Sequence, residues 1–127
     1  YGWPLRSYGC PYGAPVGDSC RVGGGVHMPQ DGRSFVEPHA IWVPTSIAPS
    51  NLLVYRGTGF TEWQGQLLVG ALAGQRLWRL ELGADARVTR CEALLGGLDA
   101  RIRDLRLGPD GWPWILTDAG EIHRIRR

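Results

Sequence analysis

The sequence predicts an all-β protein made of short antiparallel strands, preceded by a loop rich in Gly and Pro. Three observations favour this fold class. The 127 residues include 19 Gly and 9 Pro, a composition typical of a chain that turns often. Short apolar runs alternate with turn residues from residue 35 onward. No helix competes with them, because the best helical segment, residues 93–103, is interrupted by two glycines that each cost about 1 kcal/mol.

The first part of the chain divides into this loop and a series of expected strands. Residues 1–34 have little periodicity, which is typical of an irregular loop. Strands are expected over residues 40–43, 52–55, 66–71, 76–82 and 87–94. The first ends at Pro44, the second runs into a Gly-rich turn, and the third is apolar enough to be buried on both faces. The fourth depends on Leu77, Leu80 and Leu82 for its apolar face, and the fifth alternates less cleanly, as an outer strand does.

The last part of the chain repeats this order. Strands are expected over residues 102–107, 113–117 and 121–125, separated by a Gly-Pro-Asp-Gly turn and an Ala-Gly turn. When residues 67–74 are set over residues 112–120, their Ala-Gly pairs coincide at an offset of about 45 residues, the length of one four-stranded propeller blade. We therefore expect residues 35–97 to form one blade and residues 98–127 an incomplete last blade. Because stable stacking needs at least about three repeats, these two blades are expected to belong to a larger ring.

The charge pattern argues against two classes of partner. The 14 basic and 12 acidic residues give a net charge of +2, and they are interleaved along the chain, so no nucleic-acid partner is expected. No apolar run approaches the roughly 18 residues that span a bilayer, so no membrane partner is expected either. The chain begins at Tyr1 without Met or a signal-like segment and stops inside the last expected strand. We therefore expect it to be a piece of a longer protein.

The cysteines and histidines point to no metal site and no hydrolytic site. Cys10, Cys20 and Cys91 are odd in number and include no CxxC pair, which argues against zinc. A Cys10–Cys20 disulfide and free thiols both remain open. No Ser or Cys nucleophile has a matched His, so a hydrolase is not favoured. Surface or structural roles are expected for His27, His39 and His123.

Seven short strings occur in order along the whole chain. They are YGWP (residues 1–4), SYG (7–9), WVPTSIAPS (42–50), LVGALAGQ (68–75), RIRD (101–104), GPDG (108–111) and LTD (116–118). Each string alone is weak evidence, but the ordered set is specific. Together they resemble the C-terminal third of the soluble pyrroloquinoline-quinone-dependent aldose sugar dehydrogenases, the glucose/sorbosone dehydrogenase family.

The resemblance implies a six-bladed β-propeller that oxidises an aldose sugar by hydride transfer to pyrroloquinoline quinone, with a calcium ion at the quinone. It also implies a periplasmic or secreted protein whose remaining blades lie in the same chain. In the family order the catalytic His and the calcium-binding segment precede Tyr1. No catalytic residue and no metal ligand is therefore expected in these 127 residues, and the isolated chain is expected to be inactive.

Arg101 and Arg103 match the family arginines that bind the quinone. Arg suits this role because it keeps its charge and offers a planar fork of donors to carboxylate and quinone oxygens. In an extended segment residues i and i+2 share a face, so both guanidinium groups are expected to project together while Ile102 points the other way. Asp104 is expected either to hold one of the arginines or to cap the following turn.

Two further residues match positions of the family's cofactor pocket. Ser46 falls where a small hydroxyl residue contacts the cofactor, although a Ser in such a sequence also commonly bonds its own backbone. Trp42 is expected either to form a wall of the sugar or quinone pocket or to be a core residue. The chain also departs from some relatives, which carry a quinone-binding Lys where this sequence has Ala73.

A second function is compatible with the same strands. Three copies of a two-blade module would close a six-bladed ring, which could bind sugars or another partner without catalysis. Such a self-closing module should sediment as a trimer, whereas a single copy with open blade edges should aggregate. The sequence leaves open which function applies, which sugar is used and what accepts the electrons.

Overall fold

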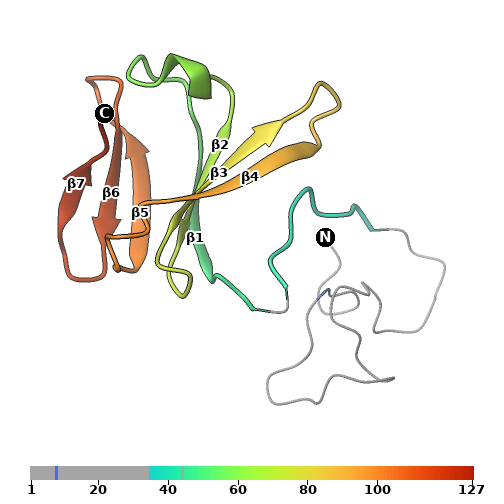
Figure 1. The fold of residues 1–127 in the computed structure, drawn as a ribbon, viewed down its shortest axis with the longest axis horizontal. Coiled ribbons are helices and arrows are strands. Elements are labelled where there is room, and N and C mark those ends of the chain that lie inside the picture. The colour runs from blue at the N-terminus through green and yellow to red at the C-terminus, as the bar shows by residue number, and fades with distance from the viewer. Residues whose placement is uncertain (1–7, 9–34, 44) are drawn as a thin grey trace. The chain divides into compact units, whose positions relative to one another are not determined.

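The computed structural model describes residue 8, residues 35–43 and residues 45–127, and the chain divides into two units. The first unit is Tyr1–Ser46 and the second is Ile47–Arg127. The regular secondary structure of the described residues lies in the second unit (Figure 1). Most of the expected loop over residues 1–34, with Cys10, Cys20 and His27, falls outside the described residues. Within the first unit, the Tyr8 hydroxyl donates to the Glu37 carboxylate.

The second unit is all-β and consists of two antiparallel sheets. The four-stranded sheet has the order β1-β2-β3-β4, and the three-stranded sheet has the order β5-β6-β7. Its elements are β1 (Pro49–Val54), the 3-10 helix η1 (Thr61–Trp63), β2 (Leu67–Ala71), β3 (Leu77–Leu82), β4 (Val88–Leu94), β5 (Ile102–Leu107), β6 (Pro113–Thr117) and β7 (Ile122–Arg124). Each sheet is a meander in which sequential strands pair, as in a propeller blade.

The internal repeat predicted the equivalence of the two sheets correctly. β2 and β6 are the second strands of their sheets, and β3 and β7 the third strands. The Ala-Gly turns at residues 73–74 and 119–120 connect these strands in both cases. The left-handed backbone conformation falls on Gly120 in the second turn, with φ +81°, and on Gln75 in the first, with φ +46°.

One expected strand is wrong. Residues 40–43 belong to neither sheet in the described part of the chain, and β1 begins at Pro49 instead. A strand needs a neighbour that satisfies its backbone N–H and C=O groups, and a short apolar run before a proline does not supply one. The four strands of the first sheet therefore all come from Pro49 onward.

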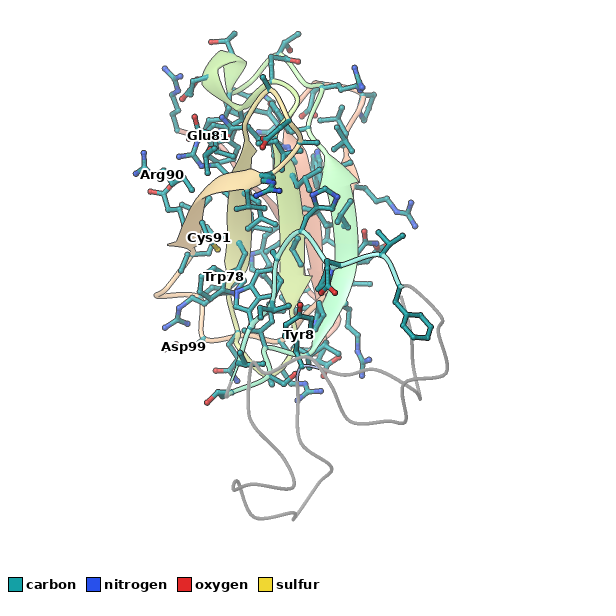
Figure 2. The ribbon with its side chains drawn as sticks, turned by 90° about the vertical axis from the view of Figure 1, so that its right-hand side faces the viewer. Tyr8, Trp78, Glu81, Arg90, Cys91 and Asp99 are labelled. Atoms are coloured by element: carbon teal, nitrogen blue, oxygen red, sulfur yellow. The ribbon has the colours of Figure 1, made fainter. Side chains whose placement is uncertain are left out.

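A shared core joins the two sheets. Its members are buried and come from both sheets and from the loop after β1: Tyr55, Phe60, Leu68, Leu77, Ile102, Leu105 and Ile115. β1 and β2 lie against β5, and Gly70 gives the space that this contact needs. A Cβ on Gly70 would lie 2.9 Å from the Ile102 side chain. β4 lies at the outer edge of the first sheet and carries Arg90 and Cys91 (Figure 2).

The strand directions define two ends of the sheet pair (Figure 1). What we call the lower end carries the β2–β3 turn, the β4–β5 connection and the β6–β7 turn, residues 72–76, 95–101 and 118–121. The upper end carries the loops at residues 55–66 and 108–112. Hydrogen bonds join the sheets at both ends: Ser50 Oγ donates to the Ile102 carbonyl at 2.6 Å, and Tyr55 Oη donates to the Gly111 carbonyl at 2.9 Å. β1 and β5 therefore run side by side in the same direction.

Candidate functional site

Two arginines and one aspartate meet at the lower end of the second sheet. Arg101 lies just before β5, Arg103 lies within it, and Asp118 follows β6. Arg101 Nε donates to Asp118 Oδ2 at 2.7 Å, and Arg103 Nε donates to the other oxygen, Oδ1. One carboxylate therefore bridges two guanidinium groups, with a separate oxygen for each.

The pairing of β5 with β6 explains why these side chains meet. Ile102 pairs with Thr117 and Asp104 pairs with Leu116, so Arg103 is an extra residue that forms a β-bulge. A bulge redirects the side chain of the extra residue and bends its strand. Here it brings the Arg103 guanidinium to the same carboxylate as that of Arg101, while Ile102 is fully buried between them.

Backbone bonds hold Asp118 in place. Its N–H donates to the Arg101 carbonyl at 2.9 Å, which continues the ladder by one residue beyond Thr117. The turn then closes with a bond of 3.0 Å from the Gly120 N–H to the Thr117 carbonyl. Gly120 adopts φ +81°, a conformation that costs a glycine little. The carboxylate is thus attached to a tight turn and not to a long loop.

The cluster carries a net charge of +1 and remains open to solvent. The side chains of Arg101 and Arg103 are 47% and 54% exposed, and that of Asp118 is 29% exposed. Desolvation raises the pKa of the Asp118 carboxyl, but hydrogen bonds from both arginines and their charges outweigh it and hold the pKa below its ordinary value of 3.8. Apart from Asp118, no side chain or backbone group in the described part of the chain accepts a hydrogen bond from either guanidinium, so no described residue occupies their Nη nitrogens. The arrangement fits an anionic group that accepts several N–H donors.

The predicted pairing of the two arginines agrees with this geometry, but the expected role of Asp104 is wrong. Asp104 accepts from Arg106 Nε at 3.1 Å, from the Leu105 N–H at 2.9 Å and from the Asn51 side chain. It therefore links β5 to β1 and to a different arginine. The residue that holds Arg101 and Arg103 is Asp118, which the sequence presents only as part of an ordinary turn. The one signal for it is position: it directly follows the strand expected to pair with the arginine strand.

The two other expected pocket residues, Trp42 and Ser46, lie in the first unit, and Ala73 stands where some relatives carry a quinone-binding Lys. Trp42 is half-buried and Ser46 is exposed, both within Tyr1–Ser46, and each makes contacts of its own. Their roles at a cofactor stay predictions. Ala73 is exposed in the β2–β3 turn, where its N–H donates to the Ile47 carbonyl at 3.0 Å.

Acidic, histidine and cysteine side chains form no metal centre among the described residues. No group of three or more of them lies close enough together to hold an ion there. His39 is exposed, and a His123 ring nitrogen lies 3.2 Å from the Glu121 carboxylate. Cys91 is an exposed free thiol on β4, and partial burial raises its pKa. In the same described residues, no helix is long and apolar enough to cross a membrane.

Comparison with known proteins points to one family over nearly the whole chain. The family model described as Glucose / Sorbosone dehydrogenase matches residues 1–126. The aldose sugar dehydrogenase YliI of Escherichia coli is 31% identical over 131 aligned positions, which cover 98% of this chain and 32% of that protein. An uncharacterized protein of Synechocystis is 34% identical over 129 positions, 99% of this chain and 28% of the relative.

Solved structures give the same result. A glucose dehydrogenase crystal structure superposes with a TM-score of 0.71 at 37% identity, over 98% of this chain and 33% of that one. The soluble aldose sugar dehydrogenase of Escherichia coli, crystallised in its apo-form, superposes with a TM-score of 0.70 at 28% identity, over the same shares. The chain therefore spans about a third of the length of the relatives that it matches.

Proposed function

The chain belongs to the glucose/sorbosone dehydrogenase family, and on this basis we propose that it forms part of a quinoprotein that oxidises aldose sugars. In this proposal the complete enzyme is a six-bladed propeller, periplasmic or secreted, and these residues supply two of its blades. Their task is to form one wall of the pocket for pyrroloquinoline quinone. The catalytic base and the calcium ligands belong to other parts of the enzyme.

The convergence of Arg101 and Arg103 on one carboxylate supports this proposal most directly. The lower end of the second sheet presents two half-exposed guanidinium groups whose Nη nitrogens face no described partner. A tricarboxylate quinone offers acceptor oxygens that suit such donors, and the net charge of +1 favours an anion. When bound, this cofactor would supply the redox chemistry by taking up the hydride of the sugar.

The two arginines would bind and orient the cofactor. Arg keeps its charge at any working pH, so its attraction for a carboxylate does not depend on protonation. Two donors on separate residues fix the ligand's direction as well as its position, which one flexible cation does not do. Trp42 as a pocket wall and Ser46 as a further contact complete the proposed set. Ala73 adds no cationic contact, so more of the anchoring falls to the arginines.

A titration of the complete enzyme tests the proposal. Replacing Arg101 or Arg103 by Ala should weaken quinone binding by about 1.5 to 3 kcal/mol, the range for a charged hydrogen bond. Arg106→Ala is the matched control. Arg106 lies on the same strand and its side chain is 77% exposed, but it pairs with Asp104 and not with Asp118. Equal quinone affinity in all three variants and the parent enzyme would contradict the assignment.

The alternative function gives a different result in solution. If the chain is a non-catalytic module that closes a ring by self-association, the 127 residues should sediment as a trimer. That outcome, combined with no quinone binding in the presence of calcium, would replace the enzyme proposal by the binding-module proposal.

A further inference from the structure

We infer that Asp118 is a positioning residue for the cofactor pocket: by accepting the Nε–H of both Arg101 and Arg103, it directs their Nη nitrogens toward the bound anion. The inference rests on the proposed function, because it assigns a ligand to the two arginines. It goes beyond that proposal by naming what holds the arginines in a binding geometry before the ligand arrives.

The donors of a guanidinium explain how one carboxylate sets its direction. Each group is a rigid plane with five N–H donors, one on Nε and two on each Nη. A bond from Nε fixes the plane along one edge and leaves the edge formed by the two Nη nitrogens available. Because Arg101 uses Oδ2 and Arg103 uses Oδ1, the two planes are also fixed relative to each other.

Without this carboxylate the pair would lose its order. Both side chains are about half exposed, and a free Arg side chain has close to the largest rotamer entropy of any residue. Two adjacent cations also repel each other, which separates their guanidinium groups. The cost of ordering them would then fall on ligand binding.

Asp118 is rigid enough for this role. Its backbone N–H is bonded to the Arg101 carbonyl at 2.9 Å, and the next turn is closed by Gly120. Thr117 is only 2% exposed, and its hydroxyl stabilises the turn further by accepting a hydrogen bond from the Glu121 N–H at 3.3 Å. The carboxylate therefore sits on backbone that is itself bonded to the arginine strand.

Charge and position predict opposite effects when Asp118 is neutralised. An Asp118→Asn variant raises the net charge of the cluster from +1 to +2. If only charge mattered, an anionic ligand would bind this variant more tightly. If Asp118 orders the arginines, the ligand would bind more weakly. The sign of the change separates the two explanations.

The experiment is a quinone titration of the complete apoenzyme, with kcat at saturating quinone and a thermal melt for each variant. We expect Asp118→Asn to raise the Kd for pyrroloquinoline quinone by about tenfold, as expected when two side chains must be ordered on binding. The Kd should change far more than kcat at saturating quinone, and the melting temperature should fall no further than it does in Asp110→Asn, which also loses an arginine pair. A merely structural role would not give this split. A Kd for Asp118→Asn that is equal to or below that of the parent enzyme overturns the inference.

Two further variants complete the design. Asp110→Asn is the matched control, because Asp110 accepts from Arg124 Nη1 at 3.1 Å but lies at the upper end, at the other end of β6. The Kd of the Asp110→Asn variant for pyrroloquinoline quinone should equal that of the parent enzyme. Asp118→Glu keeps the charge and moves it by one methylene, so a raised Kd here supports positioning even if Asp118→Asn fails to fold, and an unchanged Kd contradicts it.

Arg101→Ala separates this inference from the proposed function. If Arg101→Ala weakens quinone binding and Asp118→Asn does not, the arginines bind the cofactor and Asp118 does not position them. If neither variant weakens binding, the quinone assignment itself fails.

Discussion

At the scale of single residues, close backbone contacts hold the upper end of the sheets together. Tyr55 is fully buried, and its hydroxyl accepts the Phe60 N–H at 3.0 Å while donating to the Gly111 carbonyl. Gly57 lies beside the Tyr55 hydroxyl and the Gly111 carbonyl. A Cβ built on it would clash with the Gly111 carbonyl and lie 2.6 Å from the Tyr55 hydroxyl and 2.7 Å from Leu107. Only a residue without a side chain fits there.

This contact predicts a specific loss of stability. Gly57→Ala should lower the free energy of unfolding by about 1 to 3 kcal/mol, because a methyl group must displace backbone as well as side-chain atoms. Gly97→Ala is the control, since nothing lies within 4 Å of a Cβ at that position. It should leave stability unchanged or raise it by up to about 1 kcal/mol. If the two substitutions change the free energy of unfolding in urea equally, the close contacts at Gly57 do not limit the size of the residue there.

The candidate site shows what residue patterns can and cannot predict. The spacing of Arg101 and Arg103 indicates a shared direction, and the structure brings both side chains to one carboxylate. The identity of that carboxylate was not predictable from spacing. Asp104 is the acid next to Arg103 in sequence, but the bulge at Arg103 and the β5–β6 register bring Asp118 to Arg101 and Arg103 from 17 and 15 residues away. Contacts of this kind depend on register, which local sequence does not specify.

At the scale of secondary structure, turn residues predict where strands end but not whether an apolar run finds a pairing partner. The bounds of β5 and β6 agree with the expected ranges because Gly, Pro and Asp mark the turn between them. The expected strand over residues 40–43 is wrong, since an apolar run forms a strand only beside a partner. The 3-10 helix η1 was not predicted. A single turn of this kind has no periodic pattern, and it is set by packing of Phe60 and Trp63, whose rings stack at 3.9 Å.

The faces of β1 lead to a prediction about neighbouring blades. Leu53 packs against the shared core, whereas Leu52 and Val54 alternate with it and are 56% and 40% exposed on the opposite face. In a propeller each blade packs against one neighbour on each face. We therefore expect another blade to cover Leu52 and Val54 in the complete enzyme.

A polar substitution on that face tests this expectation. Leu52→Asn should destabilise the complete enzyme by about 1 to 3 kcal/mol, because it buries an amide without a partner. Thr89→Asn on the outer strand β4, where Thr89 is exposed, is the control and should change stability by less than about 0.5 kcal/mol. If both variants have the same melting temperature as the parent enzyme, the open face of β1 is not an interface.

At the scale of the whole molecule, arginine–carboxylate pairs are spread over both sheets. Arg79 Nη2 lies 2.5 Å from Glu92 on the first sheet, and Asp110 and Asp118 pair with arginines at the two ends of β6. Hydrogen bonds from Arg79 lower the pKa of Glu92. For Asp110 and Asp118, desolvation raises the pKa, but bonds from arginine and other donors outweigh it and the net shift is downward.

These lowered pKa values predict the direction of the pH dependence. The unfolded chain takes up protons near the ordinary values of 3.8 for Asp and 4.5 for Glu, before the folded chain does. The stabilising contribution is therefore complete above those values and is lost as the pH falls through the lower folded-state pKa values. Denaturation midpoints should be flat from about pH 7 to 5 and decline below about pH 4, less steeply at high salt. A midpoint that rises as the pH falls through this range would contradict the assignment of the pairs.

The proposed function depends on Arg101 and Arg103 holding the cofactor at the lower end of the second sheet. The most direct measurement is a structure of the complete enzyme with pyrroloquinoline quinone bound. Nitrogens of both guanidinium groups should lie about 2.7 to 3.2 Å from cofactor oxygens, with Asp118 still bonded to the two Nε atoms. A cofactor bound elsewhere, with both arginines directed into solvent, would contradict the account.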